Sequence, residues 1–295
     1  MKFIYTLRQD LNKTIINIGF IGAALMTCVL AFTASAYMDT TTDKSYTVIE
    51  AFLTFDKKFV ESDYTFASMN VFSKALSGYI SMFIPIIVAF PFMVSFCAER
   101  NNGLMRFTIT RTGKMRYYLS KFFASFLGGG LAVFLGVALF GICVRFMFPA
   151  FSSYDIDPEM KRMMFTLSEG QIIMNTLLSA FVYGAFSTLP AFFLSSFCKN
   201  PYIITCLPFM LVYIWQTAIN KLQLKMFEDF SSFDQSFYDK LVGFSPNSPQ
   251  YIPNVLFFDE IQPVTKYAMW FNGIYLVVLL VGFISIMNLR TDKGS

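Results

Sequence analysis

Six long apolar runs divide the chain, and they constrain its fold more than any other feature of the sequence. Each is close to or above the roughly 20 apolar residues that a helix needs to cross the hydrocarbon of a bilayer. Arg145 is the only charged residue within them. They predict an all-α integral membrane protein, one transmembrane domain over residues 1–295, with six spans at about 15–37, 75–97, 122–148, 172–197, 202–219 and 267–288.

The composition agrees with this fold class. Charged residues make up 14% of the chain, against roughly 25% in soluble domains, and mean hydropathy is +0.54. None of the runs shows the alternating pattern of a membrane barrel strand. The first run is too long for the apolar core of a cleavable signal peptide, so we expect it to stay in the membrane.

Two absences exclude several kinds of chemistry. The chain has no histidine, which removes Ser-His and Cys-His catalysis and the commonest metal ligand. We therefore predict no metal site and no catalytic residue. The five cysteines lie within or at the ends of the apolar runs, so no disulfide framework is implied; they are Cys28, Cys97, Cys143, Cys198 and Cys206.

The distribution of basic residues predicts the orientation. With six spans both termini lie on one side, and that side holds 12 of the 23 Lys and Arg residues against three carboxylates. The positive-inside rule makes this side cytoplasmic. We expect a multi-pass protein of a bacterial cell membrane. The basic residues on this side are Lys2, Arg8, Lys13, Arg100, Arg106, Arg111, Lys114, Arg116, Lys121, Lys199, Arg290 and Lys293.

The segments outside the spans have patterns of their own. Residues 1–14 place apolar side chains at helical spacing between charged ones, which predicts an amphipathic helix lying in the membrane interface. Two long outer loops follow, at 38–74 and 220–266. Three prolines in the second loop predict a partly helical, partly irregular cap before the last span. Prolines within spans two, four and five predict kinks; they are Pro85, Pro91, Pro190 and Pro208.

Span three carries a ridge of small residues at roughly helical spacing. Such ridges let two membrane helices approach closely, in this chain or between two chains. The predicted helix-packing residues are Ser125, Gly129, Ala132 and Gly136.

The spans have no ionisable residue near their centres, where proton- or sodium-driven carriers place them. A cation channel would in turn need an acidic ring or a carbonyl filter signature. The chain also has no phosphate-binding loop of the G-x-x-x-x-G-K-[ST] type. If the protein moves a substrate, we expect the energy to come from a separate ATPase that docks on the cytoplasmic side.

The connection at 98–121 is the one cytoplasmic segment large enough for such a docking site. It holds six Lys and Arg residues and one carboxylate, Glu99, which we expect to pair with a loop arginine such as Arg100 or Arg106. Positive-inside anchoring explains part of this charge, in particular Arg116 and Lys121 at headgroup level. It does not explain the apolar side chains in "LMRFTIT".

This layout resembles the permease subunit of type-2 ATP-binding-cassette exporters. In that family the second span ends in an acidic residue, followed by a glycine, an arginine-bearing apolar segment and a lysine that opens the third span. Glu99, Gly103, Arg106 and Lys121 are similar in kind and place. Arg111 stands where many family members have a proline.

The resemblance implies a coupling helix that fits a groove on the ATPase, a second permease chain that is identical or paralogous, and contact with membrane lipids but no nucleic acid. This chain would hold no cofactor, since ATP and Mg would bind the partner ATPase. The residues that we assign to ATPase coupling are Glu99, Arg100, Gly103, Leu104, Met105, Arg106, Phe107, Ile109 and Arg111.

Two alternatives stay open. The chain could be a membrane enzyme that modifies a lipid or peptide, or a sensor or immunity protein that binds a peptide through its outer loops. For an exporter, the abundance of Phe and Met favours an amphipathic cargo such as a peptide, a drug or a lipid-like molecule. The acidic residues open to the enzyme are Asp229, Asp234, Asp239, Asp259 and Glu260.

Overall fold

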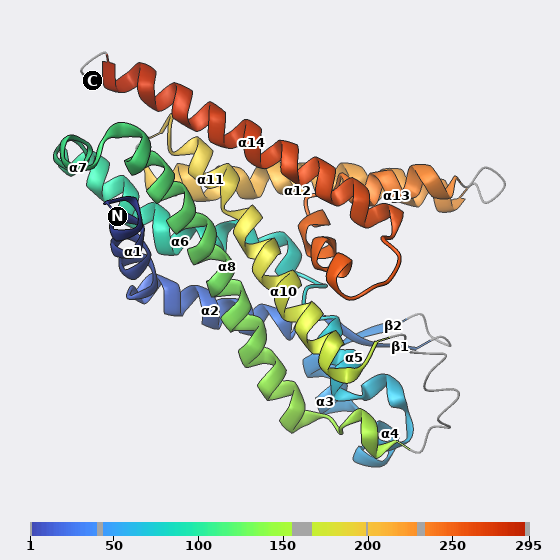
Figure 1. Cartoon of the computed structure of the whole chain (residues 1–295). Coiled ribbons are helices and arrows are strands. Elements are labelled where there is room, and N and C mark those ends of the chain that lie inside the picture. The colour runs from blue at the N-terminus through green and yellow to red at the C-terminus, as the bar shows by residue number, and fades with distance from the viewer. Residues whose placement is uncertain (1, 40–43, 155–166, 199, 229–233, 293–295) are drawn as a thin grey trace.

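The computed structural model is a bundle of helices with a small hairpin at one end (Figure 1). It describes residues 2–39, 44–154, 167–198, 200–228 and 234–292. The first half contains α1 (Lys2–Ile15), α2 (Ile18–Ala31), β1 (Ser35–Asp39), β2 (Lys44–Thr47), α3 (Val48–Thr54), α4 (Lys57–Ser62), η1 (Tyr64–Phe66), α5 (Ser68–Ser73), α6 (Ile80–Asn101) and α7 (Leu104–Thr112). The second contains α8 (Lys114–Met147), η2 (Phe151–Ser153), α10 (Glu169–Ser187), α11 (Leu189–Leu194), α12 (Pro201–Glu228), α13 (Gln235–Gly243), η4 (Ser248–Leu256) and α14 (Pro263–Asp292).

Among the described residues, five helical segments are long and apolar enough to cross a membrane: α6, α8, α10 with α11, α12 and α14. The pair α1 and α2 passes the same test together, with a bend of 60°, so the helical membrane fold is confirmed with five or six spans. Asn17 fixes the bend, because it caps α2 by accepting from the Gly19 N–H and donates to the Pro91 carbonyl at 3.3 Å.

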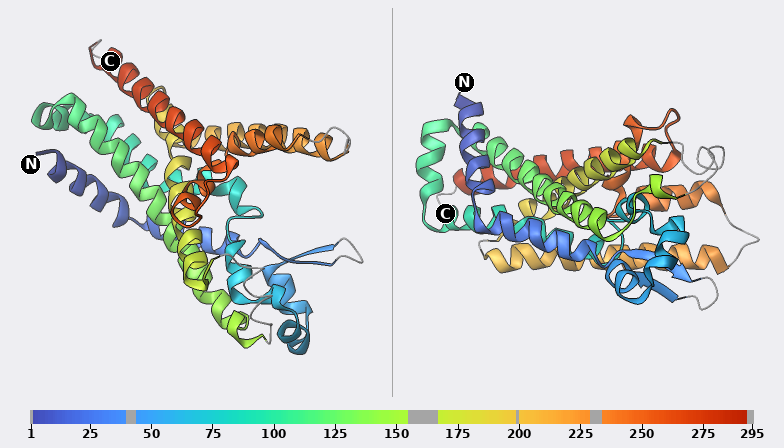
Figure 2. Two further views of the ribbon diagram at one scale, coloured as in Figure 1. Left: turned by 45° about the vertical axis from the view of Figure 1, so that its right-hand side comes forward. Right: turned by 90° about the horizontal axis from the view of Figure 1, so that it is seen from below.

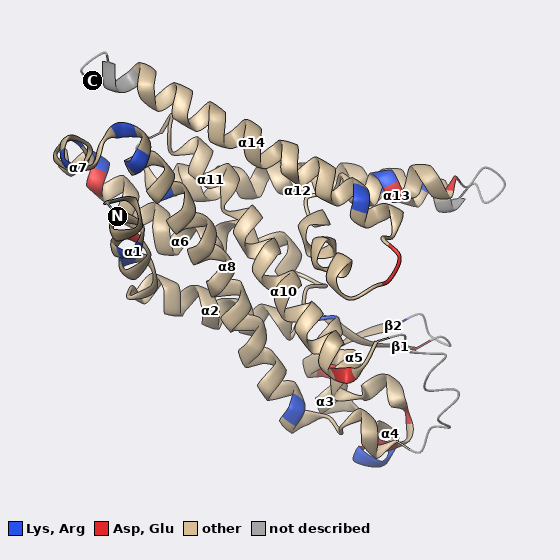
Figure 3. Cartoon of the chain, viewed as in Figure 1, with Lys and Arg blue, Asp and Glu red and all other residues tan. Residues whose placement is uncertain are grey.

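Both chain ends and α7 lie at one end of the bundle, and the hairpin, α3, α4 and α5 lie at the other (Figures 1 and 2). We call these the terminal end and the hairpin end. In Figure 3 the long helices carry no charged residues through their middles, and the charges gather near the two ends. The arrangement is that of a helix bundle with its apolar middle in the membrane and its charged ends outside it.

The first predicted span is shorter than the sequence suggested. A helix was expected over 15–37, but α2 ends at Ala31 and the chain enters β1 four residues later. β1 pairs antiparallel with β2, and the hairpin is held by a cluster of aromatic rings in which Tyr37 stacks on Phe66 with centroids 5.0 Å apart. These aromatic residues are distant in the sequence, so the apolar pattern does not show that they pack together. Their packing favours a strand over the predicted helix at 35–37.

The last three spans also differ in extent from the predicted runs. The run at 172–197 is divided at Thr188. Helix α11 begins at the next residue, Leu189, and Pro190 lies in its first turn. The run at 202–219 continues as α12 to Glu228, and Pro208 lies inside it; Pro85 and Pro91 likewise lie inside α6. The predicted cap before the last span consists of α13 and η4.

Helix α8 is the centre of the bundle and packs against α1, α2, α6 and α10. The predicted ridge of small residues lies on it, and all four members are buried. The ridge contacts two different helices of this chain. At Gly136 a Cβ would stand 2.6 Å from the Ala24 carbonyl oxygen of α2, whereas at Gly129 it would meet Thr188, beside α10.

Gly78 joins the hairpin end to α6 and is a position that only glycine fits. Its φ is +73°, and a Cβ would lie 2.7 Å from the Thr33 carbonyl oxygen. Left-handed backbone costs a non-glycine residue roughly 1–2 kcal/mol, and the clash adds to this. We expect Gly78→Ala to lower the thermal unfolding temperature measured in detergent. Gly170→Ala, where nothing lies within 4 Å of a Cβ, is the control, and an equal shift in both variants would contradict the assignment.

Candidate functional site

Helix α7 forms a separate nine-residue element at the terminal end, between α6 and α8 (Figures 1 and 2). Gly103 before it and Gly113 after it have φ of +70° and +88°. Glycine adopts these values readily, so the two residues let the chain turn sharply into and out of α7. Helix α7 is therefore a separate helix and not a continuation of α6 or α8, the two long helices that it connects.

The apolar side chains of α7 divide between two faces. Met105 and Ile109 pack against the core cluster formed by α6, α8, α11, α12 and α14. Leu104 and Phe107 are 51% and 73% exposed. An exposed pair of large apolar side chains at i, i+3 spacing on a charged helix is a surface suited to contact with another protein. We call Leu104 and Phe107 the exposed face of α7.

An ion network lies directly behind α7. The ammonium of Lys121 on α8 is 2.9 Å from Oδ1 of Asp10 on α1 and 2.6 Å from Oε2 of Glu99 on α6. Lys13, also on α1, lies 3.2 Å from the other oxygen of Glu99. These four residues, which we call the ion network, join three helices at one point.

The centre of the ion network is shielded from solvent. The side chains of Lys121 and Asp10 are 5% and 7% exposed, that of Glu99 is 17%, and that of Lys13 is 54%. The Ser120 hydroxyl donates to Oδ2 of Asp10 at 2.6 Å. Each oxygen of the Asp10 carboxylate thus has its own donor, as buried charges require.

The end of α6 is held from a second side as well. The Arg100 guanidinium donates to the backbone carbonyls of Ser195 and Cys198, which follow α11. Glu99 and Arg100 therefore anchor the last turn of α6 to α8 and to the end of α11. Glu99 was expected to pair with a loop arginine, but in the structure it pairs with Lys13 and Lys121. Lys121 reaches Glu99 because its side chain extends from the first turns of α8 into the bundle and not outward to the headgroups.

A groove of about 820 Å³ runs between α1 and α7 over the ion network. From α7 it is lined by Phe107 and Arg111, among others, and Tyr5 and Gln9 line it from α1. Arg111 and Arg106 are both exposed. The surface at the terminal end is therefore basic at its rim, with the Phe107 ring inside it.

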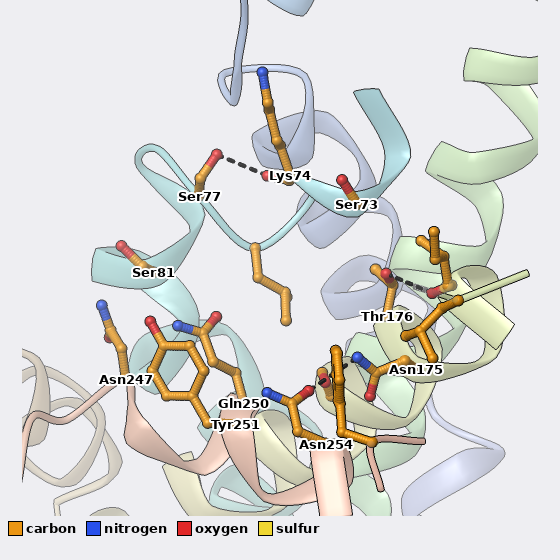
Figure 4. Close-up of a pocket in the computed structure, with 15 residues that line it drawn as sticks. Ser73, Lys74, Ser77, Ser81, Asn175, Thr176, Asn247, Gln250, Tyr251 and Asn254 are labelled. Carbon is orange, nitrogen blue, oxygen red and sulfur yellow. Dashed lines mark hydrogen bonds between the residues drawn. The ribbon is translucent and has the colours of Figure 1, made fainter. Parts of the chain in front are cut away.

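A second cavity, of about 610 Å³, lies at the hairpin end (Figure 4). It is bounded by α10, by the connection from α5 to α6 and by the segment around η4. Asn175 donates to Oδ1 of Asn254 at 2.9 Å, and the buried Tyr183 hydroxyl lies 2.7 Å from both the Ser81 carbonyl oxygen and Oδ1 of Asn247. These bonds connect the cap to α6 and α10.

Two of the acidic residues of the second outer loop have structural contacts, whereas Asp259 and Glu260 are exposed. Asp234 caps α13 by accepting from the Ser236 and Phe237 N–H groups, and Asp239 is buried and accepts from Gln235 at 2.8 Å. Asp229 lies outside the described residues, as do Lys199 and Lys293. Within the described part of the chain, no three His, Cys, Asp or Glu residues come together as a metal site would require.

Neither family models nor curated proteins match the sequence. Of the site residues, the sequence singled out Glu99 and the face of α7. It missed that Asp10 and Lys13 join this network, and it interpreted Lys121 as a headgroup anchor and, through the family resemblance, as the lysine that opens the third span. The available signal was a single carboxylate, Asp10, on the N-terminal helix, where it was counted only as part of the polar face.

Proposed function

We propose that this chain is the membrane-spanning permease subunit of an ATP-driven exporter of the ATP-binding-cassette type. The observation that carries the proposal is α7, a short helix with an uncovered apolar face that directly joins α6 to α8, the two helices that the ion network holds to α1. A separate ATPase docks on the exposed face of α7 and in the adjoining groove. ATP and Mg bind that partner.

The ion network supports a mechanical role for α7. Because Lys121, Asp10 and Glu99 hold α8, α1 and α6 together at one buried point, a displacement of α7 is transmitted to all three helices as a unit. ATPase closure pushes α7, and the connected helices rotate as a rigid body against α12 and α14. Motions of this kind, rather than continuous deformation, are typical of packed helices.

The rest of the assembly follows from the same proposal. Two permease chains, identical or paralogous, enclose the pathway in a bacterial cell membrane, with the terminal end in the cytoplasm. The cargo is amphipathic, in keeping with a chain in which 37 of 295 residues are Phe and 17 are Met. The chain itself performs no catalysis.

The test is co-purification of the ATPase. We expect the tagged wild-type chain, extracted from its native membrane in mild detergent, to retain an ATP-binding-cassette ATPase detectable by mass spectrometry. The double variant Leu104→Asp/Phe107→Asp should lose at least nine tenths of it, because two carboxylates then face the apolar groove of the partner.

The control adds the same charge beside α7 without altering its face. Asn101→Asp/Asn102→Asp changes two exposed residues and should retain the ATPase. Thermal unfolding of both variants monitors the fold. If no such ATPase accompanies the wild type while other membrane complexes stay intact, or if both variants retain it equally, the proposal fails.

A further inference from the structure

The cavity at the hairpin end is polar but almost uncharged. Ten of its fifteen lining residues carry a neutral hydroxyl or amide group, and within the described chain Lys74 is its single charged residue. The Lys74 ammonium donates to the Ala36 carbonyl oxygen at 3.1 Å, and burial lowers the pKa of the group. Figure 4 shows the Lys74 side chain directed away from Asn175, Asn254 and Tyr251. The single charge of the described lining is therefore directed away from these three side chains, although Lys74 itself is an exposed residue.

One group in the lining lacks a partner. Oδ1 of Asn175 is buried and makes no hydrogen bond to the described residues, although its amide nitrogen is bonded to Asn254. A buried acceptor without a donor costs about 1–3 kcal/mol. This oxygen is closed off in the structure, so a ligand hydroxyl removes the penalty only when the Asn175 amide turns toward the cavity.

We propose that the cavity binds the uncharged saccharide part of an amphipathic ligand. Saccharide hydroxyls both donate and accept, and so do the amides of Asn and Gln. The lining hydroxyls of Ser73, Ser77, Ser81 and Thr176 donate to backbone carbonyls and keep lone pairs that accept from a ligand.

A charged group would lose its hydration, and the one charged side chain of the described lining, Lys74, is directed away from Asn175, Asn254 and Tyr251 (Figure 4). The rings of Tyr251 and Phe258 in the lining offer apolar faces to a sugar ring. The volume lies within the about 300–1,000 Å³ of small-molecule sites.

The observations favour a saccharide over a peptide. Extended peptides pair with an open sheet edge, and helical or proline-rich ones lie in apolar grooves. This cavity is lined by helices, turns and mainly polar side chains. As cargo recognition the inference rests on the proposed exporter function; as ligand binding it does not, because no ATPase takes part.

The cavity also lies where a ligand can affect the bundle. Two of its lining residues, Ser81 at the start of α6 and Asn247 in the cap, are both bonded to the Tyr183 hydroxyl of α10. A saccharide bound between these elements contacts both the cap and α6, the helix that leads to the ion network. Binding is therefore expected to stabilise one arrangement of the cap relative to α6.

The test uses the purified full chain in lipid nanodiscs on an array of neutral oligosaccharides, with sialylated glycans and alanine peptides as comparison spots. We expect saturable binding to at least one neutral glycan. Gln250→Leu and Asn254→Leu, two lining residues, should each weaken it at least tenfold. Gln262→Leu, an exposed residue beyond the cavity, should leave it unchanged.

Two variants are used because Asn254→Leu also removes the hydrogen bond with Asn175 that connects the cap to α10, whereas Gln250→Leu leaves that bond in place. Three results would overturn the assignment. The chain could bind no neutral glycan above the level of empty nanodiscs, it could bind only charged glycans or peptides, or all three variants could bind equally. ATPase co-purification is measured without saccharide, so loss of either result leaves the other standing.

Discussion

Lys121→Met is expected to lower the free energy of unfolding by about 3–5 kcal/mol, the effect of removing one partner from a buried ion pair. The Lys121 ammonium is the shared cation between Asp10 and Glu99, at 2.9 and 2.6 Å, and it is almost fully buried. Methionine fills most of the same volume but leaves two carboxylates close together without it. The measurement is thermal and denaturant unfolding of the purified chain in detergent.

Lys13→Met is the matched control, since it removes a lysine from the same network. The Lys13 side chain is 54% exposed and lies 3.2 Å from Glu99, and exposed ion pairs contribute about 0–1 kcal/mol. A small change in unfolding free energy for Lys13→Met and a large one for Lys121→Met would support a buried centre of the ion network. Equal shifts would mean that solvent reaches the whole network.

A second substitution tests whether the loss comes from the stranded charge. Asp10→Asn combined with Lys121→Met removes one carboxylate together with the cation and leaves Glu99 with Lys13. Residues in one network do not act additively, so the double variant should be more stable than Lys121→Met alone. If the two substitutions simply add, the pairing of Asp10 with Lys121 does not carry the stability of this joint.

The spans could be predicted because the signal is local. An apolar run of sufficient length must be helical in a bilayer whatever it packs against, and the runs that contain α6, α8, α10 and α14 follow from that rule alone. The residues at which these helices begin and end are harder to predict. At 35–37 the run stays apolar, yet β1 forms there because Tyr37 packs with Phe55 and Phe66, residues that the run does not include.

The ion network shows the opposite case. Lys121 stands at the edge of an apolar run, where a lysine usually extends to the headgroups. It is buried because Asp10 lies against it, and 111 positions separate the two residues. No local pattern encodes such a pair in one sequence. The two faces of α7, in contrast, follow helical spacing: 104 and 107 fall on one side, and 105 and 109 on another.

Gly136→Ala is expected to lower the free energy of unfolding by about 1–3 kcal/mol through overpacking. The added Cβ would lie 2.6 Å from the Ala24 carbonyl oxygen and 2.5 Å from Cβ of Thr27. Backbone cannot rotate out of the way as a long side chain can, so α2 must move from α8. Since α2 continues from α1 through the bend at Asn17, this movement also strains the helix that carries Asp10 and Lys13.

Gly273→Ala is the control for this substitution. Gly273 lies in α14 with nothing within 4 Å of a Cβ, and alanine is favoured over glycine inside a helix by roughly 0.5–1 kcal/mol. The unfolding temperature should therefore fall for Gly136→Ala and stay level or rise for Gly273→Ala. A rise for both would show that α2 and α8 are separated by more than the structure describes. Loss of ATPase binding in Gly136→Ala but not in Gly273→Ala would further connect the α2–α8 contact to the position of α7.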